Sequence, residues 1–188
     1  MTHTVTLELD RRFRDAAAAA GLLDVGFDVI ESPVGPLLVA ATERGLARIF
    51  FDAEPEAQLD RLARTYGPRV LRSSASVEAV HRQLDEYFDG KRSDFTLDVD
   101  LRGTAPFARH VLEELSQVPY GQTTTYGTLA GRVGAPRAAR AVGTVMNRNP
   151  IPIVLPCHRV VGANGSLTGY GGGLHVKEHL LRLEGALL

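Results

Sequence analysis

The sequence is poor in sulfur and in large aromatic residues, with one cysteine, no tryptophan and two methionines among 188 residues. A single cysteine excludes an internal disulfide framework and any zinc module built from several cysteines, and it suits a reducing compartment. No apolar run approaches the about 18 residues that cross a membrane, and the first residues lack the basic segment and apolar core of a signal peptide. We therefore expect a cytoplasmic protein without a membrane span.

A large excess of charge of either sign is lacking too, because the chain has 21 Lys and Arg residues and 22 Asp and Glu residues. A formal net charge of −1 argues against a protein that is basic all over. It leaves room for a local basic face, which is the usual electrostatic footprint of a nucleic-acid-binding protein. The chain is 44% hydrophobic and 23% charged, enough for a substantial core in one domain or two small ones.

The first hundred residues predict a small sheet with helices. An alanine-rich segment before Gly21 predicts a short helix or a mobile arm over residues 11–20. Short apolar runs joined by Gly and Pro turns predict an antiparallel meander, and later spacing predicts two helices and one half-buried strand. The strands are expected at residues 25–31, 37–42, 46–51 and 95–101, and the helices at residues 59–66 and 77–88. No residue here suggests chemistry, so we interpret this half as scaffold.

Arg102 and Gly103 mark a plausible boundary between an N-terminal domain, residues 1–102, and a C-terminal domain, residues 103–188. Thr104 can cap a helix that has Pro106 in its first turn. Two short helices, residues 125–133 and 137 to about 147, are joined by a turn that contains Gly134 and form a helix-turn-helix candidate. A final helix is predicted over residues 174–183.

The only cysteine lies in the segment of residues 151–161, and the apolar residues before it predict a buried strand. Pro150, Pro152 and Pro156 cannot donate to a ladder and favour an edge or irregular position. Cys157 would then stand at the end of a stiff segment, which suits a nucleophile. The alternative is a buried structural cysteine, because free cysteine is among the most buried residue types.

A nucleophilic cysteine needs a base, because the thiolate attacks and the thiol does not. His158 is the candidate, although neighbours in an extended segment point to opposite sides, so the contact is either direct or bridged by a water molecule. Glu178 is the best-placed acid to orient the histidine. Asn149 could bond the backbone near Cys157, and Tyr126 offers a phenolic hydroxyl. Each of these residues taken alone is more often structural.

The second helix of the pair carries small residues beside arginines. Ala138, Ala139 and Gly143 would let another backbone approach, and Arg140 is placed to pair with its phosphates. So few long polar side chains favour sequence-independent binding in a narrow groove. The alternative is a helix packed against its own protein, with solvated arginines.

Residues 175–179 match the H-x-x-E-H pattern of one class of zinc proteases. His175 and His179 would share one helix face, but packing alone accounts for an amphipathic helix here, and a further ligand would have to come from upstream. We therefore predict no metal and no cofactor.

The C-terminal half resembles the O6-alkylguanine-DNA alkyltransferases, also called methylated-DNA–protein-cysteine methyltransferases. The resemblance covers about residues 107–185 and rests on separate motifs in the same order. These are VPYGQTTTYG at 118–127, AARAVG at 138–143, NPIP at 149–152, PCHRVVG at 156–162 and GYGGGL at 169–174, followed by KE at 177–178. The N-terminal half is only loosely similar.

The resemblance implies a role for each residue of interest. Cys157 would accept the alkyl group, and His158, through a water and with Glu178 behind it, would generate the thiolate. Asn149 would brace the turn before the cysteine. Tyr126 would help to rotate the damaged base out of the stack, and Arg140 would fill the gap. Further contacts are implied for Ala138, Ala139 and Gly143 in the minor groove, and for the Val160 carbonyl, Tyr170 and Gly171 around the guanine.

The expected fold is α/β, with an N-terminal ribonuclease-H-like domain and a C-terminal winged helix-turn-helix domain. The expected function is single-turnover DNA repair, in which the alkyl group of O6-alkylguanine, or of O4-alkylthymine, moves irreversibly from double-stranded DNA to Cys157 of a monomer. Two alternatives stay open. One is a lesion-sensing protein of the alkyltransferase-like kind, which lacks the acceptor cysteine, and the other is a hydrolase that uses Cys157, His158 and Glu178.

Overall fold

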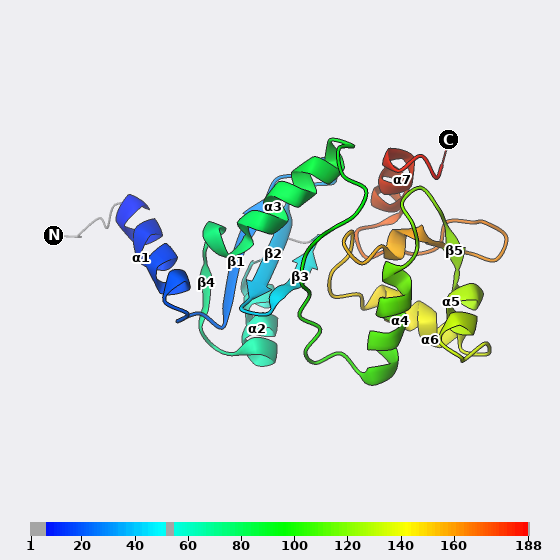
Figure 1. The fold of residues 1–188 in the computed structure, drawn as a ribbon, viewed down its shortest axis with the longest axis horizontal. Helices are drawn as coiled ribbons and strands as arrows, with labels where there is room; N and C mark the ends of the chain where they lie inside the picture. The colour runs from blue at the N-terminus through cyan, green and yellow to red at the C-terminus, as the bar shows by residue number, and fades with distance from the viewer. Residues whose placement is uncertain (1–6, 52–54, 188) are drawn as a thin grey trace.

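The computed structural model describes residues 7–51 and 55–187. A sheet with helices forms the N-terminal half, and short helices with long connections form the C-terminal half beside it (Figure 1). The first helix, α1 (Leu7–Ala19), stands at the end of the molecule far from the C-terminus, with Phe13 67% exposed. It covers most of the predicted alanine-rich helix and is followed by Gly21 at φ +66°.

The sheet has the strand order β3-β2-β1-β4. The predicted meander is confirmed in β1 (Val25–Ile30), β2 (Leu37–Thr42) and β3 (Gly45–Phe50), which pair antiparallel. The fourth strand, β4 (Val70–Arg72), pairs parallel with β1 and was not predicted, because three residues carry no readable alternation.

Two helices cover the two faces of this sheet. Both were predicted: α2 (Pro55–Tyr66) and α3 (Ser74–Phe88). Side chains alternate along β2, so that Val39 packs in the cluster that includes α3 and Leu38 packs with Leu62 of α2. The sheet is therefore buried on both sides, which explains why its central strand is continuously apolar.

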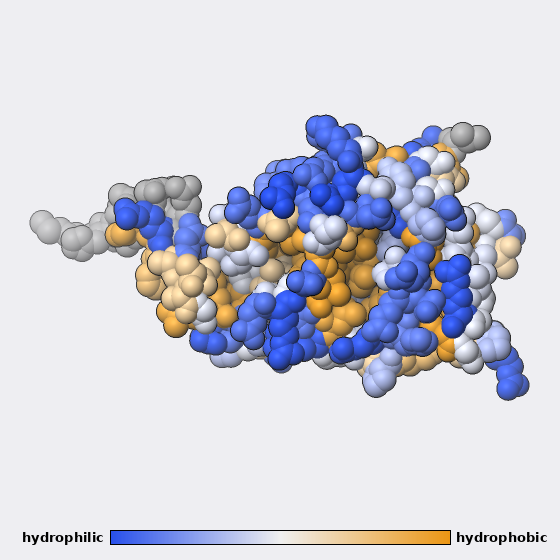
Figure 2. All heavy atoms as spheres, viewed as in Figure 1, coloured by the Kyte–Doolittle hydropathy of each residue, from blue (hydrophilic) through white to orange (hydrophobic). Residues whose placement is uncertain are grey.

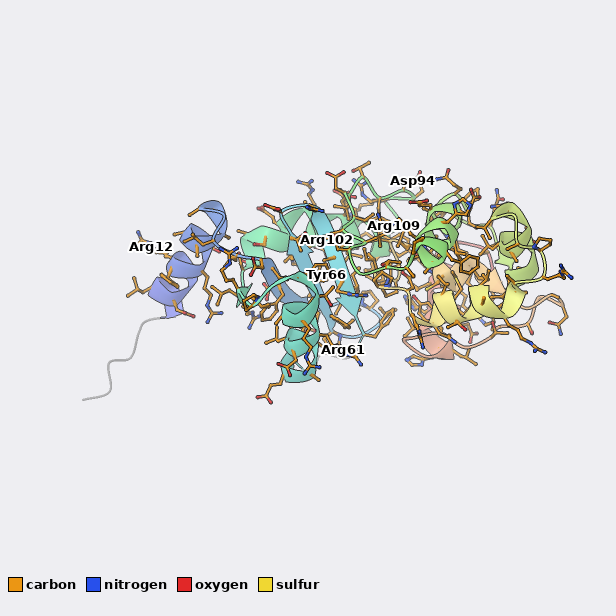
Figure 3. The ribbon with its side chains drawn as sticks, turned by 90° about the horizontal axis from the view of Figure 1, so that it is seen from below. Arg12, Arg61, Tyr66, Asp94, Arg102 and Arg109 are labelled. Carbon is orange, nitrogen blue, oxygen red and sulfur yellow. The ribbon has the colours of Figure 1, made fainter. Side chains whose placement is uncertain are left out.

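The predicted strand over residues 95–101 is wrong. This segment is extended, but only Val99 forms a bridge, with Leu46. Two backbone bonds of 2.8 Å, from Leu46 to Asp98 and from Asp100 to Leu46, hold it before it leaves the sheet for the next helix. The buried Asp100 carboxylate anchors the same segment by accepting from Thr42 and Arg102, and Arg102 lies over the Tyr66 ring, with 5.4 Å from Cζ to the ring centroid (Figure 3).

The C-terminal half begins with α4 (Pro106–Ser116), whose N-cap is Ala105 and not the predicted Thr104. Ala105 adopts the extended cap conformation directly before Pro106, so the helix starts one residue later than a Thr104 cap would require. The helix-turn-helix is present as α5 (Tyr126–Arg132) and α6 (Ala139–Asn147), and the last helix, α7 (Leu174–Leu183), has the predicted bounds.

One hydrophobic cluster spans both halves of the molecule, because it contains Leu37 and Leu84 from the first half and Leu129 and Val160 from the second. Figure 2 shows polar residues over most of one face, with apolar residues mainly in the middle of the molecule. In the described residues, no helix is both long and apolar enough to cross a membrane. The shared cluster fixes the N-terminal sheet against the segment that carries Cys157.

Candidate active site

The segment before Cys157 is not the predicted strand. Residues 152–154 form a turn, Cys157 opens a short 3₁₀ helix, η1 (Cys157–Arg159), and only β6 (Val160–Val161) is extended, parallel to β5 (Thr124–Thr125). Pro150, Pro152 and Pro156 supply no N–H groups for a ladder. Ile153 also has a φ of 75°, a left-handed conformation that a β-branched residue adopts at a cost of about 1–3 kcal/mol. Its fully buried side chain offsets that cost.

Asn149 braces this irregular segment, as expected. Its Nδ2 donates to the Leu155 carbonyl at 2.7 Å and to Sγ of Cys157 at 3.1 Å, and its Oδ1 accepts from the Ile151 amide at 3.1 Å. One side chain thus replaces the backbone bonds that the prolines cannot make and also contacts the sulfur.

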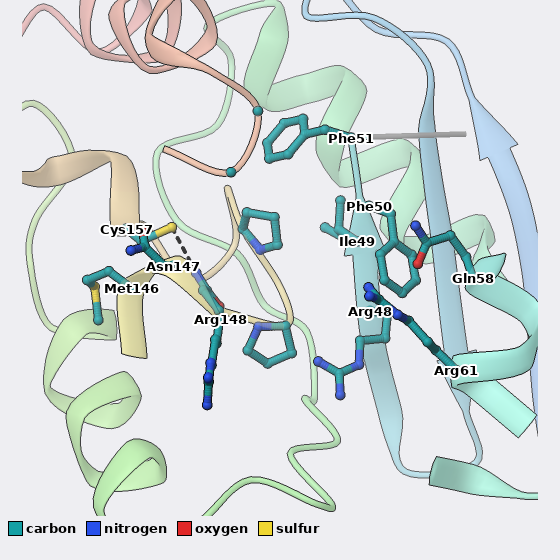
Figure 4. A pocket seen from close by; sticks show the side chains of 15 residues that line it. Arg48, Ile49, Phe50, Phe51, Gln58, Arg61, Met146, Asn147, Arg148 and Cys157 are labelled. Atoms are coloured by element: carbon teal, nitrogen blue, oxygen red, sulfur yellow. Dashed lines mark hydrogen bonds between the residues drawn. The ribbon is translucent and has the colours of Figure 1, made fainter. Parts of the chain in front are cut away.

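Cys157 faces a cavity of about 610 Å³ between the two halves (Figure 4). The C-terminal half contributes Asn149, Pro152 and Gly171 to its lining, and the N-terminal half contributes Phe51 and Arg48. Burial raises the pKa of the Cys157 thiol to about 11, although the Asn149 hydrogen bond and the charge of Lys177 act in the opposite direction. The resting sulfur is therefore a protonated thiol that needs a base.

His158 and Arg159 leave η1 on the side away from the cysteine, because successive side chains of a 3₁₀ helix are about 120° apart. Both reach Glu184, which lies just beyond α7. Nε2 of His158 is 2.8 Å from Oε1, and Arg159 donates from Nε to Oε2 at 2.9 Å and from a terminal nitrogen to Oε1 at 3.0 Å. Burial alone would raise the pKa of Glu184, but hydrogen bonds and charge from His158 and Arg159 lower it to about 2.

The acid behind the histidine is therefore Glu184, and the prediction of Glu178 is wrong. The Glu178 side chain is 45% exposed and pairs with Arg182 at 2.9 Å. Helical geometry explains the difference, because Glu184 continues the buried stripe of Lys177 and Leu181 at spacings of four and three, whereas Glu178 lies off that stripe. The sequence did contain this signal, but the helix was expected to end before it.

His158 carries the features of a general base. Its side chain is fully buried, and Nδ1 has no hydrogen-bond partner among the described residues. Burial lowers its pKa, and Glu184 partly opposes this effect. Because the Glu184 carboxylate accepts the proton on Nε2, Nδ1 is left as the acceptor.

The residues expected to contact DNA lie on α6, at its N-cap Ala138 and on the neighbouring α5. Arg140 is exposed, and Ala138, Ala139 and Gly143 are half-buried. The Tyr126 ring packs against Gly143, where an added Cβ would lie 3.8 Å from the ring, and the Tyr126 hydroxyl hydrogen-bonds to Thr168 at 2.6 Å. The helix α6 thus carries small residues beside Tyr126 and a charged side chain at Arg140.

Of the residues expected around the base, Gly171 lines the same cavity, while Val160 and Tyr170 are outside the set of described residues that line it. The Val160 carbonyl accepts from Nζ of the buried Lys177 at 2.6 Å and keeps a second lone pair. Tyr170 packs its ring edge-on against Phe51, with centroids 5.4 Å apart. Gly171 is exposed with open space at its Cβ position, while a Cβ on Gly172 would meet the Phe51 ring at 2.9 Å.

The H-x-x-E-H pattern does not gather ligands. His175 and His179 are exposed on α7, and Glu178 is paired with Arg182. Within residues 7–51 and 55–187, no group of three His, Cys, Asp or Glu side chains is close enough to hold a metal ion.

Comparison with known proteins identifies both halves. Residues 26–101 match the ribonuclease-like domain of 6-O-methylguanine DNA methyltransferase, and residues 106–186 match the DNA-binding domain of that protein. A methylated-DNA–protein-cysteine methyltransferase of Methanosarcina barkeri is 44% identical over 161 residues, which cover 84% of this chain and 96% of that protein. The chain belongs to the 6-O-methylguanine DNA methyltransferase family. Its mixed α/β fold, expected from the resemblance, is confirmed.

Two further relatives give the same result. The methyltransferase of Mycobacterium leprae is 45% identical over 159 residues, which cover 82% of this chain and 89% of the relative. The crystal structure of Mycobacterium tuberculosis OGT in complex with DNA superposes with a TM-score of 0.75 at 38% identity, over 86% of this chain and 93% of that one. Family membership therefore rests on sequence and on three-dimensional structure.

Proposed function

We propose that this protein repairs DNA by direct reversal, moving the alkyl group of O6-alkylguanine to Cys157 once per protein molecule. The observation that supports this most is that the side chains of η1 point to two different environments. Cys157 faces the cavity, Asn149 donates to its sulfur, and His158 with Glu184 lies directly behind it. This arrangement can generate a thiolate without exposing a charge to solvent.

The proposed step is a single displacement. A bridging water carries the Cys157 proton to Nδ1 of His158, and Glu184 stabilises the imidazolium that results. Sγ forms a bond to the alkyl carbon while the carbon–O6 bond breaks, with its electron pair left on the guanine. Guanine then takes up a proton, for which we propose the Tyr126 hydroxyl as the donor. The thioether product is not hydrolysed, so the cysteine is consumed.

The alkylated base must leave the stack to reach the sulfur, at a cost of a few kcal/mol. We assign Tyr126 to the rotation of the base and Arg140 to the gap left behind. Ala138, Ala139 and Gly143 would line the approach of the minor groove, and the Val160 carbonyl, Tyr170 and Gly171 would surround the guanine. The exposed Arg140 and the smooth surface near Gly143 support these roles.

Several finer assignments are part of the same proposal. O4-alkylthymine is a second substrate, the working unit is a monomer in the cytoplasm, and neither metal nor cofactor takes part. Residues 1–102 act as the supporting unit and residues 103–188 as the unit that binds DNA and carries Cys157. The extended, anchored segment around Asp100 supports a boundary at this place.

The deciding experiment uses a duplex with one O6-methylguanine that carries a labelled methyl group. We expect one label per molecule on Cys157, followed by no further transfer, and no label on Cys157→Ser, as read by intact mass and peptide mapping. Binding of the duplex without transfer would instead favour a lesion-sensing protein. Repeated turnover without DNA would favour a hydrolase.

The DNA face can be tested separately with Arg140→Ala. Loss of this arginine should slow transfer from duplex DNA, because no side chain then fills the gap that the rotated base leaves behind. Transfer from the free base O6-benzylguanine should be unchanged, because that substrate needs no flipping. Equal losses on both substrates would contradict the assignment.

A further inference from the structure

One hydroxyl of the N-terminal half reaches the acid of the C-terminal half. The Tyr87 hydroxyl, on α3, donates to Oε1 of Glu184 at 2.7 Å across 97 positions of sequence. Oε1 is the same oxygen that faces Nε2 of His158. We propose that Tyr87 is a positioning residue for alkyl transfer, because its hydroxyl shares the charge of Glu184 and so keeps His158 neutral and ready to accept the thiol proton. This inference rests on the proposed function.

The geometry fixes the Tyr87 hydroxyl in place. The residue is fully buried, and its ring packs against Phe88, Phe95 and Tyr120 with centroid distances of 5.5, 5.4 and 6.2 Å. Burial and the neighbouring Glu184 raise the pKa of the Tyr87 phenol far above its ordinary value. The phenol therefore stays protonated and acts on Glu184 only as a donor.

Glu184 accepts hydrogen bonds from several donors besides His158. Oε1 accepts from Tyr87, His158 and Arg159, while Oε2 accepts from Arg159 at 2.9 Å and from the Gly121 amide at 3.4 Å. Each donor withdraws charge from the carboxylate and weakens its pull on the imidazole proton. Titratable and charged groups from every packed element face this cluster, namely Tyr87, Tyr120, Cys157, Arg159, Tyr170 and Lys177.

Tyr87→Phe removes the donor and keeps the ring. Glu184 would then hold more unshared charge, which raises the pKa of His158 and protonates it at a higher pH. In a plot of transfer rate against pH, the low-pH side (the acid limb) follows the protonation of the base, His158. The midpoint of this acid limb should therefore move up by about half a pH unit or more. Well below that midpoint the rate should fall about threefold or more. Affinity for the lesion duplex should be unchanged, since Tyr87 is buried.

Tyr120→Phe is the matched control. Tyr120 lies in the same aromatic cluster, but its hydroxyl donates to the Leu183 carbonyl at 3.1 Å and not to Glu184. This variant removes one hydroxyl from the same region and should keep the acid limb of the unaltered protein. An equal shift in both variants would overturn the proposal.

A direct measurement complements the kinetics. Side-chain ¹⁵N resonances of His158 should show a proton on Nε2 at neutral pH and a higher titration midpoint in Tyr87→Phe. If that variant does not fold, 3-fluorotyrosine incorporated at position 87 is a stronger donor and should move the acid limb to lower pH. An acid limb that stays in place, with only a lower Tm, would make Tyr87 merely structural. Failure of the unaltered protein to transfer would instead reject the proposed function.

Discussion

Cys157 and Arg159 belong to one short helix, yet they face opposite environments. In front, the sulfur is a neutral thiol beside a cavity, with one amide from Asn149. Behind lies the rear cluster, in which His158, Arg159 and Tyr87 all hydrogen-bond to Glu184, so that the charges of Arg159 and Glu184 are paired. The difference shows how a buried site can stay both reactive and stable. Charge is kept where it is fully paired, and the atom that must meet substrate stays uncharged until it reacts.

The largest effect should come from breaking the rear cluster. Glu184→Gln leaves Arg159 buried without a counter-charge, so the free energy of unfolding should fall by about 3–5 kcal/mol, and alkyl transfer should be lost. Glu178→Gln is the matched control, because its partly exposed pair with Arg182 contributes less than about 1 kcal/mol. Urea unfolding of both variants checks this. A larger loss for Glu178→Gln would reverse our assignment.

The same cluster predicts how stability depends on pH. Because the pKa of Glu184 is lowered to about 2, its contribution is present above the ordinary value of 4.5 and is lost as the pH falls from 4.5 through 2. The lowered pKa of His158 adds a loss that begins below its ordinary value of 6.5. Glu184 should contribute about 3 kcal/mol in urea unfolding at neutral pH. Glu184→Gln should lack the loss between pH 4.5 and 2, and an unchanged pH profile would contradict the rear cluster.

The front of the helix should respond less strongly. Asn149→Ala removes two donated hydrogen bonds and one accepted bond, so unfolding should become easier by about 1–3 kcal/mol. The Cys157 thiol should also titrate at higher pH, as followed with a thiol reagent. Asn147→Ala, at the exposed last residue of α6, is the control and should change neither quantity. Equal effects of both variants would mean that Asn149 does not act on the sulfur.

The smallest effect is expected at the rim of the cavity. Gly171→Ser places its Cβ in open space and should change the free energy of unfolding by less than about 0.5 kcal/mol. Gly172→Ala, one residue on, pushes a methyl group against the Phe51 ring and should cost about 1–3 kcal/mol. Thermal unfolding of the two variants separates them. A costly Gly171→Ser would show that the loop packs more tightly than the structure indicates.

Regular elements were predictable where the sequence alternates or repeats. The bounds of β2 and α7 match the prediction, because apolar residues follow the period of each element over its whole length. The two-residue strands β5 and β6 and the turns before Cys157 were missed, since no period can show in so few residues. The segment at Val99 alternates like a strand but joins the sheet at one bridge only.

The motif and the resemblance singled out Cys157, His158, Asn149 and Tyr126, and the roles assigned to these residues stay predictions. The acid was misassigned because Glu178 and Glu184 are close in sequence. Glu178 lies on a partly exposed side of α7, whereas Glu184, just beyond α7, continues the buried stripe of that helix. Arg159, Lys177 and Tyr87 were not predicted as part of the site. Each contacts it through a long-range hydrogen bond that no local pattern reveals.

The sequence by itself determined the nucleophile, the histidine beside it, the helix-turn-helix and the family, because these depend on residue type and local spacing. Only the tertiary structure decided which carboxylate serves the histidine and that the N-terminal half takes part through Tyr87. The physical reason is that burial and hydrogen-bond partners arise where distant segments pack together. The pKa values of Cys157, His158 and Glu184 depend on that packing.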